Sequence, residues 1–242
     1  MLAQFSTAAF WLALGNIIVV NVVLSGDNAI VIALAARSLA PAQQRQAIVL
    51  GSGAAIVLRI VLTIFAVSLL TLPYLKIAGA LLLLYIGMSL SSEETGPQEV
   101  GQHASLAAAI RTILLADLVM SLDNVLGVAA AAKGNMLLLV IGLVISIPLI
   151  VFGSGILLKL VQRLPVIVWF GAALLGYLAG EMLFADTALQ AWIAATVPSH
   201  AWQVPGTRML LSLPGIAGAA LALAGGRWLA RRGATAAPAQ KT

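Results

Sequence analysis

The chain of 242 residues is 62% hydrophobic and only 9% charged, with a mean hydropathy of +1.07. Such a composition leaves too little polar surface to coat a soluble globule, so the sequence predicts an integral membrane protein. The absence of cysteine excludes disulfides, zinc–thiolate sites and a cysteine nucleophile.

Hydropathy predicts an all-helical bundle of about seven transmembrane spans. The predicted spans are 10–35, 47–71, 74–90, 106–131, 136–158, 166–184 and 208–229. Several of them are separated by residue pairs that interrupt helices, namely Ala40-Pro41, Leu72-Pro73, Gly134-Asn135 and Leu164-Pro165. Small residues within the spans are expected to allow close helix packing, among them Gly51, Gly53, Gly171, Gly176 and Gly180.

Three segments outside the spans differ in character. Residues 92–105 are polar and predict a flexible cytoplasmic linker, which explains Glu93, Glu94, Glu99 and His103 better than a loop that collects metal. Residues 186–207 predict an extracytoplasmic loop with a short amphipathic helix capped by Asp186. Residues 233–242 predict a disordered tail.

Basic residues give the predicted orientation. One side of the membrane carries Arg37, Arg45, Arg111, Lys159, Arg163, Arg227, Arg231, Arg232 and Lys241, and the other only Lys76, Lys133 and Arg208. The richer side should be cytoplasmic, which places the N-terminus outside and the C-terminus inside the plasma (inner) membrane. Because this bias explains the pI of about 10.1, no nucleic-acid partner is inferred.

Two near-duplicate motifs carry acidic residues inside predicted spans: Leu24-Ser25-Gly26-Asp27-Asn28 and Met120-Ser121-Leu122-Asp123-Asn124. An ionisable side chain at this depth is costly unless it faces a partner, water or an ion. The match continues at Asn21 with Asp117, and at Leu72-Pro73, Gly79 and Tyr85 with Leu164-Pro165, Gly171 and Tyr177. We therefore predict two three-span repeats of inverted topology, residues 1–91 and 106–185, followed by a seventh helix at 208–232.

Inverted topology predicts two oxygen clusters near the membrane midplane. At about 1.5 Å per residue, Asp27 and Asp117 lie roughly 6 Å and 3 Å to the cytoplasmic side, and Asp123 roughly 6 Å to the outer side. The inner cluster would contain Asp27, Asn28 and Asp117, and the outer cluster Asp123, Asn124 and Asn21. Gly26 is expected to loosen the helix beside Asp27 and release backbone carbonyls as ligands.

The predicted ligands are hard oxygen donors, which suit Mg²⁺, Ca²⁺ or Mn²⁺. Arg59, deep in the second span, would offset one of three acidic charges and should pair with Asp27, Asp117 or Asp123. The remaining charge matches one divalent cation, although burial would equally keep one carboxyl protonated. A carboxyl that alternates between a proton and a metal would serve an antiporter. Asn21, Ser25, Ser121, Arg59 and Glu181 are expected to support the site, although for Glu181 an interfacial position is favoured over a role as a ligand.

The paired Asp-Asn helices, with Asp117 upstream of the second, resemble the TerC family of integral membrane proteins over roughly residues 10–230. The resemblance implies an exporter of divalent metal, manganese in particular, with no permanently bound cofactor. It implies that the residues corresponding to the family motifs are Asp27, Asn28, Asp117, Asp123 and Asn124.

Other interpretations of the paired acids stay open at this stage. The polar residues would also stabilise a bundle through interhelical hydrogen bonds. A partner in membrane-protein assembly or stress resistance, without transport, is the alternative function. An intramembrane aspartyl protease is disfavoured because Leu24-Ser25 precede Gly26-Asp27 where the Gly-x-Gly-Asp signature would stand, so no enzyme activity is predicted. Proton coupling and oligomeric state are left undetermined.

Overall fold

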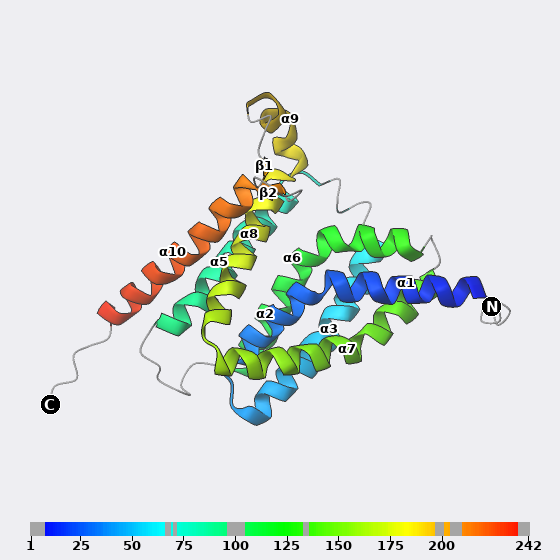
Figure 1. Cartoon of the computed structure of the whole chain (residues 1–242), viewed down its shortest axis with the longest axis horizontal. Helices are drawn as coiled ribbons and strands as arrows, with labels where there is room; N and C mark the ends of the chain where they lie inside the picture. The colour runs from blue at the N-terminus through cyan, green and yellow to red at the C-terminus, as the bar shows by residue number, and fades with distance from the viewer. Residues whose placement is uncertain are drawn as a thin grey trace. The chain divides into compact units, whose positions relative to one another are not determined.

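The computed structural model describes residues 8–65, 69, 72–95, 105–132, 136–196, 201–203 and 210–236. These residues form helices and one small hairpin (Figure 1), in the order α1 (Ala8–Leu24), α2 (Gly26–Ala36), α3 (Pro41–Ile64), α5 (Leu75–Thr95), α6 (Leu106–Ala132), α7 (Met136–Arg163), α8 (Val166–Phe184), α9 (Thr187–Thr196), β1 (Ala201–Gln203), β2 (Leu210–Ser212) and α10 (Leu213–Ala236). The predicted helical class is confirmed. The antiparallel pairing of β1 with β2 was not predicted.

Several helices are long and apolar enough to cross a membrane. Within the described residues there are five such segments: Pro41–Ile64, Leu75–Ser92, Leu139–Arg163, Val166–Phe184 and Leu213–Arg232. They contain 18 to 25 residues, so their lengths of about 27 to 38 Å match a hydrocarbon core of about 30 Å. Two shorter apolar segments, Phe10–Val20 and Gly26–Ala36, come from α1 and α2. The chain is an integral membrane protein.

Helix boundaries differ from the hydropathy prediction where polar residues continue a helix. The predicted second span began at 47, but α3 begins at Pro41, a residue suited to the first helical position. Helix α5 continues past residue 90 to Thr95, and α7 past 158 to Arg163. Helix α10 begins at Leu213 rather than 208 and reaches Ala236, so residues 233–236 are helical and not part of a disordered tail. Hydropathy marks apolar stretches, whereas helical hydrogen bonding extends beyond them.

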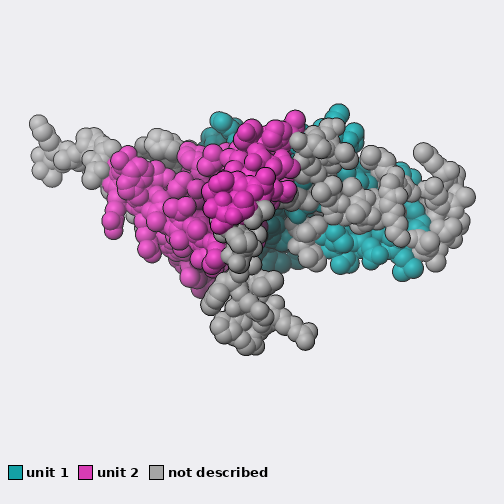
Figure 2. Space-filling view, turned by 90° about the horizontal axis from the view of Figure 1, so that it is seen from above, with its two compact units in different colours: residues 1–70, 103–162 teal, residues 71–102, 163–242 magenta. Residues whose placement is uncertain are grey.

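The chain packs into two compact units, which Figure 2 colours separately. Unit 1 comprises Met1–Leu70 and His103–Gln162, and unit 2 comprises Thr71–Gln102 and Arg163–Thr242. In unit 1, α3 packs along α6, and both α1 and α2 pack against α6. Its apolar core includes Ile17, Ile113 and Leu143.

Two glycines of α3 differ in whether another helix approaches them closely. A Cβ added at Gly51 would lie 2.8 Å from Ile113 Cδ1, so glycine allows α3 and α6 to pack together, as predicted. A Cβ added at Gly53 would meet no atom within 4 Å, so the packing role predicted for Gly53 is wrong.

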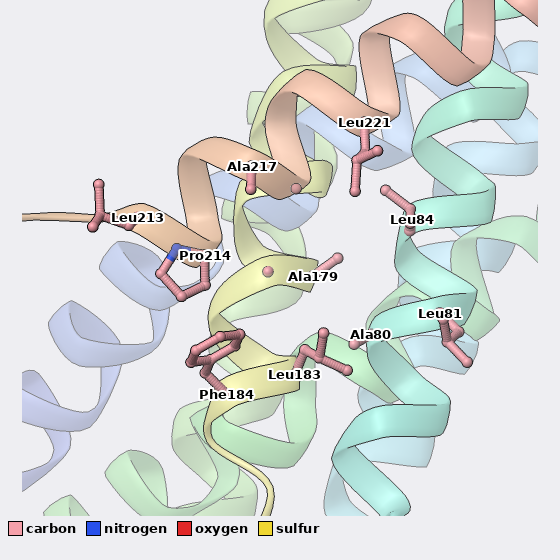
Figure 3. Close-up of a pocket in the computed structure, with 12 residues that line it drawn as sticks. Ala80, Leu81, Leu84, Ala179, Leu183, Phe184, Leu213, Pro214, Ala217 and Leu221 are labelled. Carbon is pink, nitrogen blue, oxygen red and sulfur yellow. The ribbon is translucent and has the colours of Figure 1, made fainter. Parts of the chain in front are cut away.

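Unit 2 is built on α5, α8 and α10, which pack against one another. A Cβ on Gly176 would lie 2.6 Å from Ala222 Cβ, and one on Gly180 would overlap the Pro214 carbonyl, so both glycines allow α8 to approach α10, as predicted. Between the three helices lies a cavity of about 300 Å³ lined by apolar side chains, into which Leu84, Leu183 and Leu221 point (Figure 3). This lining offers no ligand for an ion.

Asp186 links three helix ends in unit 2. Its fully buried carboxylate accepts hydrogen bonds from the backbone N–H groups of Ala188 (2.8 Å), Lys76 (3.0 Å), Tyr74 (3.1 Å) and Ile77 (3.2 Å). The predicted cap on α9 is therefore confirmed, and the same carboxylate also caps α5. Burial raises the pKa of Asp186, but the hydrogen bonds from these four N–H groups together lower it by more than burial raises it. The pKa of Asp186 therefore lies below the usual value. Tyr74 has a left-handed φ of 67°, which turns the chain toward Asp186.

Candidate ion-binding site

The first predicted span is interrupted at the residue before Gly26. Helix α1 ends at Leu24 and α2 begins at Gly26, while Ser25 between them has φ −108° and ψ 5°. A Cβ at Gly26 would meet no atom within 4 Å, so packing does not require this glycine. The predicted loosening of the helix is confirmed as a break, which places Asp27 and Asn28 in the first turn of α2.

Arg59 reaches this break from the C-terminal part of α3, with only 1% of its surface exposed. Its guanidinium donates three hydrogen bonds to residues outside α3: Nε to Ser121 Oγ (3.0 Å), Nη1 to Ser25 Oγ (3.0 Å) and Nη2 to Asp117 Oδ1 (2.5 Å). The last of these is a salt bridge. The prediction that Arg59 pairs with Asp27, Asp117 or Asp123 is confirmed, and the partner is Asp117.

Asp117 gathers donors from three elements of unit 1. Besides Arg59, its carboxylate accepts Asn28 Nδ2 at Oδ1 (3.1 Å) and Ser121 Oγ at Oδ2 (3.1 Å). The carboxylate is 7% exposed, so the ion pair and its hydrogen bonds are shielded from solvent. A buried ion pair is tolerated when its remaining donors and acceptors are satisfied in this way.

Asn28 has one polar atom that this network does not use. Its Nδ2 donates to Asp117, but its Oδ1 has no hydrogen-bond partner among the described residues, although Asn28 is only 3% exposed. An unsatisfied buried oxygen costs about 1–3 kcal/mol, so such an atom calls for water or a ligand. Amide oxygens are ligands for hard cations.

Asp27 adds a negative charge beside this oxygen. It is half-buried, accepts a hydrogen bond from the N–H of Asn28 (2.8 Å), and lies within electrostatic range of Arg59 and Asp117. With both acids ionised, Arg59 neutralises one of the two charges, so the described cluster carries one net negative charge. The predicted inner cluster of Asp27, Asn28 and Asp117 is thus brought together in unit 1.

The outer cluster is not placed in the same way. Asn21 lies in α1 and Asp123 in α6, but the structure does not describe their side chains. The predicted separation of Asp27 and Asp117 from Asp123 therefore lies outside the described residues. Asn124 is half-buried on α6, and Glu181 is exposed on α8 in unit 2. Among the side chains that the structure describes, no three or more His, Cys, Asp or Glu residues gather as a metal-binding group.

The sequence singled out Ser25 and Ser121 as matched residues but missed their common partner. Both hydroxyls accept a hydrogen bond from Arg59. The available signal was their equal spacing, since each serine precedes an Asp-Asn pair by one intervening residue. An arginine at midplane depth, with matched serines on two predicted spans, indicates a bridge between them.

A helical bundle with a broken first span and a buried Arg–Asp–Asn network defines a polytopic membrane protein with a polar centre. The family model described as "Integral membrane protein TerC family" matches residues 6–229, and the chain belongs to this family. It is 44% identical over 178 residues to the uncharacterized membrane protein YjbE of Bacillus subtilis (strain 168), covering 74% of this chain and 82% of that protein.

More distant relatives are also described as membrane proteins. The UPF0053 inner membrane protein YgdQ of Escherichia coli (strain K12) is 28% identical over 175 residues, 64% of this chain and 73% of that protein. The uncharacterized membrane protein YceF of Bacillus subtilis (strain 168) is 24% identical over 182 residues, 71% of this chain and 70% of that protein. No solved structure matches the chain.

Proposed function

We propose that this protein exports a hard divalent cation, Mn²⁺ in preference to Ca²⁺ or Mg²⁺, through the site around Asp27, Asn28 and Asp117. The observation that carries the proposal is the buried Asn28 Oδ1, which has no partner among the described residues and lies next to one carboxylate in sequence and bonded to another through Nδ2. Oxygen-only ligands suit Mn²⁺, Ca²⁺ and Mg²⁺. The preference for Mn²⁺ comes from the family resemblance.

The proposed architecture is seven spans with an inverted repeat. Two findings support it. Arg59 bonds the repeat-matched Ser25 and Ser121, so the two motifs meet at one guanidinium. Unit 1 contains the first two segments of each predicted repeat: α1/α2 and α3 from the first repeat, and α6 and α7 from the second. Unit 2 contains the third segment of each repeat, α5 and α8, together with α10. Inverted repeats commonly place a substrate site where the two copies meet.

Charge sets how a cation would bind. Asp27 supplies the one net negative charge of the described cluster, because Asp117 is paired with Arg59. A divalent ion would therefore need a second carboxylate, supplied by Asp123 or by Asp117 when Arg59 moves away. In this scheme Arg59 and the cation compete for Asp117, and protonation of Asp27 would release the ion. Asn124 and Asn21 would add amide oxygens at the outer cluster.

The remaining assignments follow from this scheme. We place the protein in the inner membrane with its N-terminus outside and its C-terminus in the cytoplasm. We assign it no enzyme activity and no permanently bound cofactor. The alternative is a partner in membrane-protein assembly or stress resistance, for which surface segments would matter more than the buried acids.

Metal content of cells tests the proposal. Cells lacking the protein should accumulate more Mn²⁺ under a manganese load than cells that express it. Asp27→Asn should fail to restore the lower content although the variant inserts into the membrane at the normal level. Glu181→Gln is the matched control, because Glu181 is an exposed acid on α8. Equal Mn²⁺, Ca²⁺ and Mg²⁺ contents with and without the protein, or full activity of Asp27→Asn, would refute export through this site.

A further inference from the structure

Two serines in the interior of unit 1 differ from the other hydroxyl residues of their helices. A serine or threonine in an apolar bundle usually satisfies its hydroxyl on a carbonyl of the preceding turn. Ser146 does so on α7, donating to Gly142 O (2.8 Å), and Thr63 does so on α3, donating to Arg59 O (2.7 Å). Ser52 on α3 and Ser154 on α7 are 1% and 0% exposed, yet their Oγ atoms have no hydrogen-bond partner among the described residues.

The two serines lie at equal distances along their own helices from a contact between helix ends. Near the start of α3 and the end of α7, Gln162 Nε2 donates a hydrogen bond to Gln44 Oε1 (3.3 Å), so these two helix ends meet. We call this the Gln44 end. Ser52 and Ser154 are equally many positions from the glutamine of their own helix, which places each about 12 Å inside that end at about 1.5 Å per residue. Pro148, the proline inside α7, lies outside the stretch from Ser154 to Gln162.

Both serines face the core of unit 1. Ser52 lies one turn from Ile48 and from Ile56, and Ser154 lies one turn from Ile150 and from Leu158. All four of these apolar residues belong to a single buried cluster. Along α3, Ser52 stands between Gln44 and Arg59, about 10 Å short of Arg59 at about 1.5 Å per residue. Ser52 therefore lies between the Gln44 end and the Arg59–Asp117 pair.

Among the described residues of unit 1, Asn28 Oδ1 is a third buried side-chain oxygen without a hydrogen-bond partner. Buried polar atoms without a protein partner are commonly satisfied by internal water, which needs two to four polar partners. Water in the interior of unit 1 would satisfy the two core-facing hydroxyls and the amide oxygen of Asn28, which lies beside two carboxylates.

We propose that Ser52 and Ser154 line a hydrated access path that leads through unit 1 from the Gln44 end to Asn28 and Asp117. The path takes water and small hydrated cations. It deepens the proposed function, because a cation site at Asn28 and Asp117 needs an approach from one side, and under the proposed orientation the Gln44 end faces the cytoplasm.

Cysteine accessibility tests the path directly. The sequence contains no cysteine, so each cysteine variant has a single thiol that a probe can label. Ser52→Cys and Ser154→Cys are compared with Ser146→Cys, the matched control on α7 whose serine is equally buried but bonded to its own helix. The probe is a cationic, membrane-impermeant methanethiosulfonate, applied separately to each side of oriented membrane vesicles.

The methanethiosulfonate reacts with the thiolate, which forms where water reaches the cysteine. The thiols of Ser52→Cys and Ser154→Cys should therefore react at least ~10-fold faster than the thiol of Ser146→Cys. They should react only when the probe is applied from the side of the Gln44 end. Labelling no faster than the control, or labelling from the opposite side alone, would overturn the path. If a cysteine variant fails to insert, hydroxyl-radical labelling of the wild-type protein replaces it. Bound water at Ser52 should then cause oxidation of Ile48 or Ile56, and their full protection would refute the proposal.

The outcome is independent of export. Adding Asp27→Asn to Ser52→Cys should leave the labelling rate unchanged, because Asp27 is not part of the path's serine segment. Labelling without any change in cellular manganese would preserve the path and refute the proposed function. Export without labelling would refute the path alone.

Discussion

Ser25 and Ser121 accept hydrogen bonds from the same guanidinium, Arg59, and both donor–acceptor distances are 3.0 Å. The two serines hold equivalent places in the two acidic motifs, one at the break between α1 and α2 and the other within α6. A single side chain from α3 therefore fixes the position of one motif relative to the other. Its third bond, to Asp117, makes this position depend on charge as well as on packing.

Replacing Arg59 by Leu should destabilise the protein strongly. The change leaves Asp117 buried without its cation, and breaking one side of a buried ion pair costs about 3–5 kcal/mol. Thermal unfolding of the detergent-purified protein measures the loss, with Arg45→Leu as the control because Arg45 is exposed on the same helix. Equal unfolding temperatures for the two variants would show that the Arg59–Asp117 pair contributes nothing to stability.

Arg59→Lys separates charge from geometry. Lysine keeps the positive charge but lacks the planar fork that serves Ser25, Ser121 and Asp117 together. We expect an unfolding temperature between those of the wild type and Arg59→Leu. A lysine variant as stable as the wild type would mean that charge alone matters at this position.

Asn28→Ala should weaken binding of Mn²⁺ to the purified protein. The change removes Oδ1, the buried oxygen without a partner, and also the hydrogen bond from Nδ2 to Asp117. Loss of one oxygen ligand should lower the affinity by about tenfold, which corresponds to about 1.4 kcal/mol. Isothermal titration calorimetry measures this, and an unchanged dissociation constant would exclude Asn28 as a ligand.

Acidification should remove the contribution of Asp186 to stability. Its folded-state pKa lies below the ordinary value, so its stabilising contribution is complete above the unfolded pKa of about 3.9 and is lost as pH falls through the folded pKa. Thermal unfolding of the wild type and Asp186→Asn should therefore differ most at neutral pH. The difference should shrink below about pH 4. A difference that does not change between pH 7 and pH 3 would contradict this linkage.

Gly180→Ala should loosen the packing of α8 on α10. A Cβ at this position would overlap the backbone carbonyl of Pro214, which has no flexible side chain to move aside. Overpacking of this kind costs about 1–3 kcal/mol. Gly53→Ala is the matched control, because its added methyl would meet open space, and the unfolding temperatures of the two variants should separate clearly. Similar values for both would argue against a tight contact at Gly180.

The centre of the candidate site was predictable because its signals are local. Asp27, Asn28 and Asp117 stand out as polar residues in apolar stretches, and Gly26 indicated the break beside them. Arg59 had to find an acid, but the choice of Asp117 depends on how α3 and α6 are aligned, which hydropathy does not determine. The same limit applies to Ser52 and Ser154, since their sequence context does not distinguish them from Ser146.

The division of the chain into units was not predictable for a related reason. Each predicted repeat is continuous in sequence, whereas each unit combines segments from both repeats. Which faces of α5, α8 and α10 pack together depends on small-residue contacts such as Gly176 with Ala222. Those contacts join residues far apart in the chain. Strand β2 shows the same limit, because its pairing with β1 depends on a partner outside its own segment.

The carboxylate of Asp186 has a mechanical consequence. Three of its four hydrogen bonds hold the first turn of α5 and the preceding Tyr74, and the fourth holds the start of α9, while Asp186 itself follows the last turn of α8. Sliding α5 along α8 would break the hydrogen bonds from Tyr74, Lys76 and Ile77 together. The carboxylate of Asp186 would then stay buried without these donors. These hydrogen bonds therefore hold the start of α5, the end of α8 and the start of α9 together as one rigid joint of unit 2.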